Sequence, residues 1–543
     1  MHKADTVAER RADIVIVGGG TGACAAALAA CMRGRTVLMT EPTQWIGGQF
    51  TSQGVPADEH RWIEHFGCSA SYRRLRDGIR DYYRRNFPLS PVAQTARFFN
   101  PGSGECSSIS AEPRAALAAL HELLAPHIHG ARLEILYEHA PVSVECEGDE
   151  IRAVRTTNLL TRDEVVLVGD YFIDASEFGD LLELTGAEYV LGAESRAETG
   201  EPHAPEDADE RCMEAITWCF AMDHVDGDHT IDRPERYEHF RASVPPYWPG
   251  PQLSFVALDY DTMGPWHHTF LPPVEDGPLW ESLWTHRRLI DQRNFSDGTF
   301  TSDIVLVNWT QNDYAYGPVV GHDASSNQHH LEEARQLSLS FLFWMQTEAP
   351  RPDGEMGWPG LRLRGDVMGT DSLAMHPYVR ESRRIRAEFT LLEEHISAET
   401  RTDGAEPFED TIGIGYYFID MHQRTESGSP YLVQTWPFQL PLGMLIPVRV
   451  RNLLPGCKNA GVTHVVNSAT REHPIEWAIG EAAGTLAAYC LDRQLPPTAI
   501  RARTHEREGF QRRLVDQGVE LEWPQVGPVR RWEDHLEYAR HVD

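Results

Sequence analysis

The chain has 543 residues, of which 41% are hydrophobic and 24% charged, so it can form two or three globular domains. No run approaches the ~20 apolar residues that span a bilayer, and we expect no membrane partner. The formal net charge of −32 argues against nucleic acid or anionic membranes as partners. An acidic cytosolic surface or a halophilic adaptation would give this charge. We favour the first and expect a cytoplasmic location.

Nine cysteines, an odd number without CxxC spacing, indicate reduced thiols and neither a disulfide framework nor a zinc site. The histidine pairs at 267–268 and 329–330 are adjacent, so the two members of each pair do not share a helix face. We therefore predict no metal. Nearly all basic residues are arginine, because lysine occurs only at Lys3 and Lys458.

The N-terminal stretch RADIVIVGGGTGACAAALAACMRGRTVLMTE has the order strand, glycine turn, helix, strand, acid. Gly18 suits the tight turn, and Gly20 lets the backbone approach a pyrophosphate held by the helix N-terminus. Ala23 stands where a third glycine is usual, and Glu41 can accept hydrogen bonds from an adenosine ribose. This pattern predicts a dinucleotide-binding βαβ unit but does not choose between NAD and FAD.

Further along the chain, the pattern predicts helices at 71–85 and 112–126 and a β-meander that ends at Asp174. An acidic, Pro/Ala-rich stretch at 194–210 indicates a boundary. The clearest helices beyond it are Leu331 to Thr347 and Tyr378 to His395. A strand at Leu453 and Leu454, a loop to His473 and a small-residue helix to Cys490 return to a Rossmann-like pattern. We predict these domains: residues 1–190 and 441–495 (nucleotide-binding), 191–440 (substrate-side) and 496–543 (helical tail).

Three motifs occur in a fixed order: the glycine fingerprint with Gly47 and Gly48, FIDASEFGD at 172–180, and NLLPGCKNAGVTHVVNSATREHPIEWAIGEAAG at 452–484. Together they resemble bacterial FAD-dependent oxidoreductases whose flavin domain is similar to that of glutathione reductase. The stretches at 308–314 and 378–395 also resemble that family. The resemblance covers residues 12 to about 520 and names no substrate.

The resemblance implies an α/β fold with a discontinuous Rossmann-like FAD-binding domain and an inserted mixed α/β substrate domain. It implies FAD as cofactor. No second dinucleotide fingerprint is visible, so we expect the electrons to leave to oxygen or another acceptor unless NAD(P)H docks transiently. We expect the cofactor to contact Gly18, Gly20, Thr21, Gly22, Ala23, Glu41, Gly48, Gln49, Val142, Asp174, Gly179, Asn467, Gly480 and Ala483. The late loop departs from the family pattern, with Cys457, Lys458 and Asn459 where a shorter Gly-Arg turn is common.

Four residues are candidates for catalysis, because flavin supplies the redox step and the protein manages protons. His464 and His473 flank the predicted flavin loop, Arg471 could clamp a carboxylate or the flavin O2, and His422 follows YYFID in the substrate domain. Each also has a purely structural interpretation. Arg380, Arg383 and Arg384 could hold an anionic substrate or lie on a solvated helix face paired with Glu381.

We expect an oxidoreductase that dehydrogenates a small polar metabolite, an alcohol or amine, by hydride transfer to flavin N5, in specialised metabolite biosynthesis. Oxygen is the expected electron acceptor, and a homodimer is an open alternative. Other hypotheses are a reductase or monooxygenase fed by NAD(P)H and a flavin-binding protein without turnover. Covalent attachment of flavin to Cys106 or a histidine is a further alternative.

Overall fold

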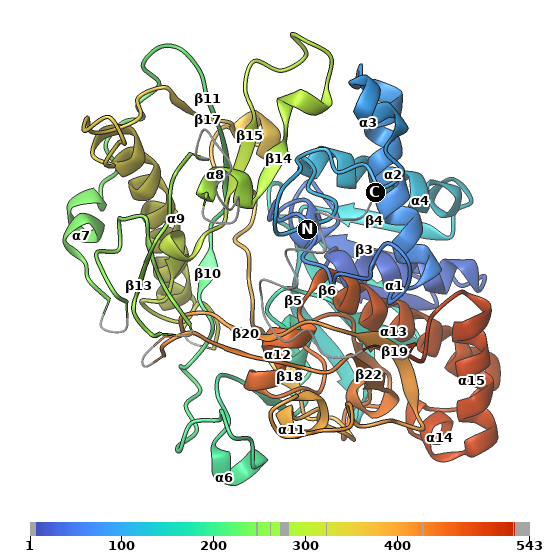
Figure 1. Ribbon diagram of the computed structural model, residues 1–543. Helices are drawn as coiled ribbons and strands as arrows, with labels where there is room; N and C mark the ends of the chain where they lie inside the picture. Colours follow the sequence, from blue (N-terminus) through green and yellow to red (C-terminus); the bar gives the residue numbers. More distant parts are fainter. Residues whose placement is uncertain are drawn as a thin grey trace, which may run out of the picture.

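A computed structural model describes residues 7–245, 248–260, 262–271, 282–321, 323–425, 428–524 and 526 (Figure 1). Its centre is a parallel five-stranded sheet with the strand order β23-β8-β2-β3-β4. The strands are β2 (Ile14–Val17), β3 (Val37–Glu41), β4 (Leu133–Tyr137), β8 (Tyr171–Asp174) and β23 (Leu453–Pro455). Strands β2, β3 and β8 are buried along their length and largely apolar, as a sheet covered on both faces requires, and polar residues occur only at the carboxyl ends of β3 and β8.

Helices α1 (Thr21–Met32) and α13 (His473–Arg493) pack against each other beside this sheet (Figure 1). Two glycines of α13 make the contact close. A Cβ on Gly480 would lie 2.0 Å from the carbonyl oxygen of Gly22, and one on Gly484 would lie 2.2 Å from that of Ala26. The small residues of both helices thus bring the chain's two ends into one Rossmann-like unit, which is discontinuous as predicted.

A second sheet has the order β1-β7-β6-β5, from β1 (Ala8–Arg11), β5 (His139–Glu147), β6 (Glu150–Asn158) and β7 (Glu164–Val168). Strands β5, β6 and β7 form the predicted antiparallel meander, and β1 adds to it in parallel. The meander was predicted to end with one strand that reaches Asp174. This stretch forms two strands instead, because Gly169 and Asp170 separate β7 from β8, and the two belong to different sheets.

The substrate-side region is mixed α/β. Its main sheet, in the order β14-β15-β11-β17, consists of β11 (Phe220–His224), β14 (Arg288–Ile290), β15 (Ile304–Val307) and β17 (Leu361–Leu363). Helix α9 (Ala324–Thr347), which was predicted, packs its buried face into the same apolar core. The fold is therefore α/β, with a discontinuous Rossmann-like domain and an inserted mixed domain. The exact limits of these domains remain predictions.

The predicted helix from Tyr378 to His395 is wrong. The segment is extended, with strand β18 (Arg384–Ile385) and then the short helix α11 (Glu393–Ile396). Arg380, Glu381 and Arg384 are all buried and make polar contacts in different directions, so they do not form one solvated helix face. The loop predicted before His473 also contains a helix, α12 (His464–Thr470).

The other helices surround these sheets. They include the predicted α2 (Ala70–Asn86), α4 (Pro113–His129) and α15 (Thr504–Asp516), together with α3 (Pro91–Thr95), α5 (Asp180–Leu184), α6 (Arg196–Thr199), α7 (Tyr237–Ala242), α8 (Leu283–His286), α10 (Gly365–Met368) and α14 (Pro497–Ala502). Short strand pairs complete the fold: β9 (Tyr189–Val190) with β18, β10 (Ile216–Thr217) with β16 (Asp313–Tyr314), β12 (Val256–Leu258) with β13 (Pro265–His267), β19 (Thr411–Gly415) with β22 (Phe438–Pro441), and β20 (Ile419–Met421) with β21 (Tyr431–Val433). Among the described residues, none of the helices has the length and apolar character to cross a membrane.

Candidate functional site

The glycine turn forms a cradle at the N-terminus of α1. Gly18 has φ +98°, and a Cβ there would lie 2.2 Å from the carbonyl oxygen of Ala175. A Cβ on Gly22 would lie 1.9 Å from the carbonyl oxygen of Gly456. The N-cap residue of α1 is Gly20, which has no side chain. The first N–H groups of the helix therefore donate no hydrogen bond to a capping side chain. This is the geometry that a phosphate group fits.

A cavity of about 170 Å³ opens from this cradle. Its lining includes Gly18 to Gly20, Thr40 to Thr43, Gly48, Ser52, His139 to Pro141, Ala175 to Phe178, Asp180 and His376. The cavity runs from Glu41 past the turn, and it is smaller than the ~300–1,000 Å³ of whole-ligand pockets. It is therefore too small for a whole dinucleotide, and its lining joins the glycine turn to Glu41.

Glu41 ends β3 at one side of this cavity, as predicted. Thr43 donates two hydrogen bonds to one carboxylate oxygen, Oε1, from its backbone N–H (2.8 Å) and its hydroxyl (2.6 Å). Burial raises the pKa of Glu41 to about 8. Because Thr43 binds only Oε1, Oε2 can accept a hydrogen bond from a ribose hydroxyl.

Most of the predicted cofactor residues divide into three groups. Gly18, Gly20, Glu41 and Gly48 line the cavity. Thr21 donates to the carbonyl oxygen of Gly47 (3.0 Å), Gln49 donates to that of Arg471 (2.9 Å), and Asn467 donates to that of Arg380 (2.9 Å). Gly22, Ala23, Gly480 and Ala483 are buried where α1 packs on α13.

Three predicted residues have local roles or lie outside the cavity. Asp174 accepts hydrogen bonds from the backbone N–H groups of Ser176, Leu181 and Leu182, and it thereby holds the loop after β8. Gly179, with φ +67°, is the N-cap of α5. Val142 has a 41% exposed side chain, and the preceding residues 139–141 line the cavity instead.

Three of the four predicted catalytic residues, His464, His422 and Arg471, belong to one buried polar network. Nδ1 of His464 lies 2.9 Å from Oε1 of Glu381, whose Oε2 accepts the backbone N–H of Glu214 (3.0 Å). The Glu214 carboxylate accepts the backbone N–H of His422 (3.2 Å) and lies 3.5 Å from Nε of Arg471. His473 follows Arg471 by two residues. Residues from four separate segments, at 214, 381, 422 and 464–471, thus meet just before the N-terminus of α13.

His422 lies between two carboxylates on the substrate side of this network. Its Nδ1 donates to Oδ2 of Asp313 (2.6 Å), and its Nε2 lies 3.5 Å from Oδ2 of Asp420. Arg380 and Thr217 hold the other oxygen of Asp313. Burial lowers the pKa of His422, but Asp313 and Asp420 outweigh burial and leave the pKa raised.

Arg471 precedes α13 and is 2% exposed. It donates to the hydroxyl of Tyr378 (2.9 Å) and to Oε1 of Glu472 (2.8 Å). Burial would lower the pKa of Arg471, but Tyr378, Glu214 and Glu472 outweigh burial, so the guanidinium stays charged. Burial raises the pKa of Glu472 to about 8.

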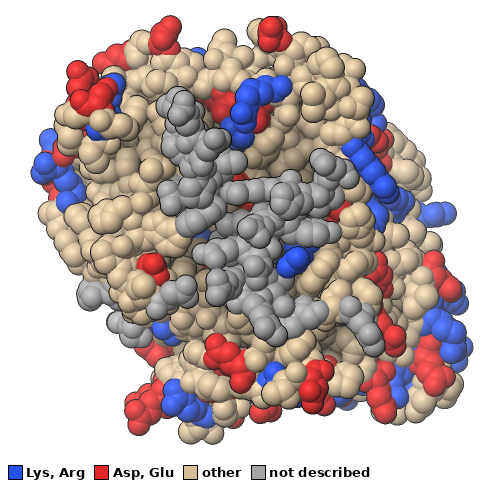
Figure 2. Space-filling model, in the orientation of Figure 1, with Lys and Arg blue, Asp and Glu red and all other residues tan. Residues whose placement is uncertain are grey.

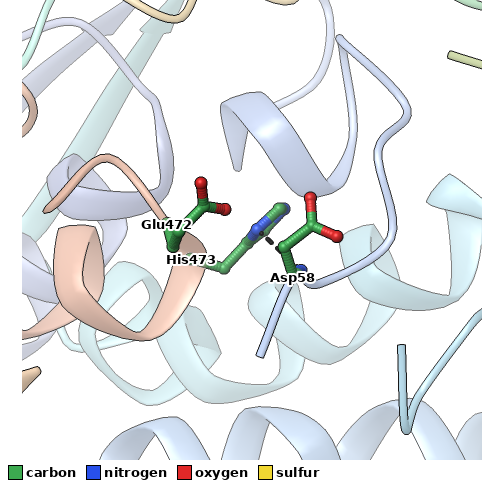
Figure 3. Close-up of side chains that lie close together, drawn as sticks. All are labelled: Asp58, Glu472 and His473. Atoms are coloured by element: carbon green, nitrogen blue, oxygen red, sulfur yellow. Dashed lines mark hydrogen bonds between the residues drawn. The ribbon is translucent and has the colours of Figure 1, made fainter. Parts of the chain in front are cut away.

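Both ring nitrogens of His473 are occupied by the backbone. Nδ1 accepts the N–H of Asp58 (3.2 Å), and Nε2 lies 3.2 Å from the carbonyl oxygen of Val55 (Figure 3). Burial lowers the pKa of His473 to about 4, so the ring is neutral. The geometry indicates that His473 positions the segment at 55–58 against α13.

Asp58, Glu472 and His473 also have potential metal-ligand atoms within 4.8 Å of one another (Figure 3). A metal would have to displace a hydrogen bond of His473, and Asp58 is already held by Arg287 through two hydrogen bonds of 3.0 and 3.2 Å. The residues as arranged are therefore a poor fit for a metal ion. The absence of a metal stays a prediction.

Cys106 faces the ring of His286, with its sulfur 3.2 Å from Nδ1 and 3.1 Å from Nε2. Burial raises the pKa of the Cys106 thiol and lowers that of His286 to about 3. Both groups are therefore neutral, and the pair lacks the thiolate that a reactive cysteine requires.

The sequence did not single out Asp313, Glu214 or the role of Glu381. Asp313 is the last residue but one of the stretch at 308–314, and Glu381 lies in the segment for which the pattern predicts a helix. Their partners His422 and His464 are 109 and 83 residues away in the sequence, so only the fold brings them together.

On the surface, acidic and basic side chains lie side by side around the rim of the face in Figure 2.

The sequence matches the family model described as FAD dependent oxidoreductase over residues 13–514. No curated protein matches it. Among solved structures, L-proline dehydrogenase from P. horikoshii is 14% identical (35% of this chain, 25% of that chain, TM-score 0.18), and the Mycobacterium smegmatis Sdh1 complex in the apo form is 13% identical (40% and 42%, TM-score 0.26). E. coli quinol fumarate reductase FrdA is 12% identical (94% and 75%, TM-score 0.34).

The aligned part of the chain thus spans less than half the length of the first two of these structures. The family match instead covers nearly the whole chain, from β2 to α15, and includes both parts of the Rossmann-like unit. The glycine cradle and the cavity beside Glu41 fit the diphosphate and ribose of the cofactor that this family uses. The chain belongs to the FAD-dependent oxidoreductase family, and it is an enzyme with FAD as its cofactor.

Proposed function

We propose that this enzyme dehydrogenates a small polar metabolite, an alcohol or an amine, by hydride transfer to flavin N5. The observation that supports this most directly is the 2.6 Å hydrogen bond from His422 to the buried carboxylate of Asp313. A histidine whose Nδ1–H is fixed by a carboxylate has its other nitrogen available for a proton, as a general base requires.

In this proposal His422 accepts the proton that leaves the alcohol or amine. Asp313 orients the ring and stabilises the imidazolium that forms. Arg380 and Thr217 keep the Asp313 carboxylate in place, so the dyad is rigid. Oδ2 of Asp420 lies 3.5 Å from Nε2, so a substrate that gives its proton to Nε2 would have to replace this contact.

Bound FAD supplies the two-electron acceptor. The chain contributes the N-terminus of α13 and the charged Arg471 before it, two features that stabilise negative charge. Arg471 is itself anchored by Tyr378 and Glu472. We assign His473 a positioning role and His464 a structural one, because His464 is 1% exposed and bound to Glu381.

The remaining predictions belong to the same proposal. These are noncovalent FAD, oxygen as acceptor, a role in specialised biosynthesis, a cytoplasmic location, the domain limits and a homodimer. A reductase or monooxygenase fed by NAD(P)H is the rival function.

The test is anaerobic mixing of the FAD-loaded enzyme with a panel of amines, amino acids and polyols, monitored by bleaching of the flavin band. We expect bleaching by one class of compound in the wild type and a large loss of rate in His422→Gln. His395→Gln, on the distant helix α11, is the matched control and should behave as wild type. Rapid bleaching by NADPH without any metabolite would favour the rival function.

A further inference from the structure

Lys458 is a buried cation in the loop that follows β23. The chain has 49 lysine and arginine residues, yet Lys458 is the only lysine apart from Lys3. Its side chain is fully buried, and Nζ lies 2.5 Å from Oε2 of Glu177. Glu476 of α13 is the second carboxylate that acts on it. An ammonium is a compact charge with three donors, and it can reach between two carboxylates where a planar guanidinium needs more room.

Both carboxylates converge on the glycine turn. A Cβ on Gly20 would lie 3.1 Å from Oε1 of Glu177 and 3.7 Å from Oε1 of Glu476. Glu476 also accepts a hydrogen bond from the amide of Gln49 at Oε2. Oε1 of Glu476 is buried and has no hydrogen-bond partner. A carboxylate therefore lies beside the start of α1, with one oxygen left for a ligand or a proton.

The diphosphate of FAD carries negative charge and needs the free N–H groups at the start of α1. Two carboxylates and one ammonium give this place a net negative charge, which opposes the phosphates until a proton is taken up. We propose that ionised Glu476 competes with the diphosphate at the start of α1 and takes up a proton when FAD binds, and that Lys458 then binds the phosphate oxygens. This assignment concerns cofactor binding and does not depend on the dehydrogenation proposed above.

The groups that face Glu476 are Lys458, Glu177 and the thiols of Cys24 and Cys457. Burial raises the pKa of both thiols, so they stay neutral. Burial would lower the pKa of Lys458, but Glu177 and Glu476 outweigh burial, so the ammonium stays charged. Burial raises the pKa of Glu476 as well, which brings its protonation closer to neutral pH. Because ionised Glu476 competes with the diphosphate, affinity for FAD should fall as pH rises.

The test uses the full chain after removal of flavin, titrated from pH 6 to pH 9 with FAD, ADP and adenosine. Flavin fluorescence reports the Kd for FAD, and calorimetry reports the Kd for ADP and adenosine. In the wild type we expect the Kd for FAD and ADP to rise with pH, by up to about tenfold per pH unit for one linked proton. The Kd for adenosine, which has no phosphate, should not change. A flat Kd for ADP in the wild type would overturn the proposal without any variant.

Three variants sharpen this result. Glu476→Gln should bind FAD and ADP with little dependence on pH, and Lys458→Met should weaken both by about 10- to 100-fold while sparing adenosine. Glu481→Gln is the matched control, since Glu481 is a buried carboxylate on the same helix that binds Ser71 instead. Thermal unfolding checks that each variant is folded. A wild-type pH dependence in Glu476→Gln, or equal weakening of ADP and adenosine in Lys458→Met, would contradict the assignment.

Discussion

Nδ1 of His422 lies 2.6 Å from Oδ2 of Asp313, although 109 residues separate them in the sequence. Asp313 is buried in strand β16, and His422 follows strand β20, so two different strand pairs bring the dyad together. Arg471 lies beside Asp420 and thereby connects the dyad to the start of α13. His422, the proposed base, is thus linked through Asp420 and Arg471 to the start of α13.

Replacing Asp313 by asparagine should slow flavin reduction at neutral pH by about 10²- to 10⁴-fold, because it removes the group that orients His422. Asp313 also raises the pKa of His422 above its usual value of 6.5. A base must be unprotonated, so the wild-type rate should rise with pH through a pKa above 6.5. In Asp313→Asn this rise of the reduction rate, the pH limb, should occur at lower pH. Stopped-flow reduction across pH measures both effects, with Asp353→Asn in an exposed loop as control. An unmoved limb would rule out this dyad.

His473→Phe should lower stability without changing the pH limb of reduction. The ring would keep its packing on Phe50, whose centroid lies 4.5 Å away, but the N–H of Asp58 and the carbonyl of Val55 would lose their partner. Each unpaired buried group costs about 1–3 kcal/mol. Urea denaturation measures the loss. If the pH limb disappears in this variant, His473 and not His422 is the base.

Glu64→Gln should destabilise the fold by about 3–5 kcal/mol at neutral pH, because Arg76 and Arg80 would remain buried with one carboxylate fewer. Burial alone would raise the pKa of Glu64, but the two arginines outweigh burial and hold it at about 2. A lowered carboxyl pKa stabilises the folded state above the unfolded value of 4.5, and this is lost as pH falls towards 2.

The difference between the wild type and Glu64→Gln should therefore shrink from pH 7 to pH 3 in denaturation experiments. Glu122→Gln, which removes an exposed ion pair with Arg85, is the control and should have little effect at either pH. A difference between wild type and Glu64→Gln that is the same at both pH values would contradict the assigned pKa.

Gly480→Ala should separate α1 from α13 and weaken FAD binding. Its Cβ would lie 2.0 Å from a backbone oxygen, which cannot move without the helix. Overpacking of this kind costs about 1–3 kcal/mol. Gly413→Ala is the control, because its Cβ would meet Ala478 at an ordinary 3.6 Å. Thermal unfolding and FAD titration compare the two, and equal effects would show that the close helix contact is unimportant.

The sequence predicted the parts of the fold that depend on local pattern. The strand before Gly18, the small-residue helix after it and the helix after Pro474 all follow from residue types within one segment. The segment at 378–395 was misread, because its Arg-Glu spacing resembles a helix with i,i+3 ion pairs. Arg384 does pair with Glu381, as predicted, but both side chains are buried in an extended segment. They also bind Glu194 and His464, which lie far away in the sequence.

The candidate site was predictable only in part for the same reason. Histidines and Arg471 near the late glycine motif could be proposed from position. Asp313 and Glu214 could not, because a carboxylate gains a role at this site only from the tertiary contact with His422. Val142 shows the limit of register prediction, since the residues just before it line the cavity.

The most direct test of the account is the absorption spectrum of the purified protein before and after acid precipitation. The account predicts oxidised-flavin bands and release of one FAD per chain into the supernatant, because Cys106, the cysteine considered for covalent attachment, is a neutral thiol paired with His286. Flavin that stays with the pellet would contradict noncovalent binding. A colourless protein that cannot be reconstituted with FAD would contradict the assignment of the glycine cradle itself.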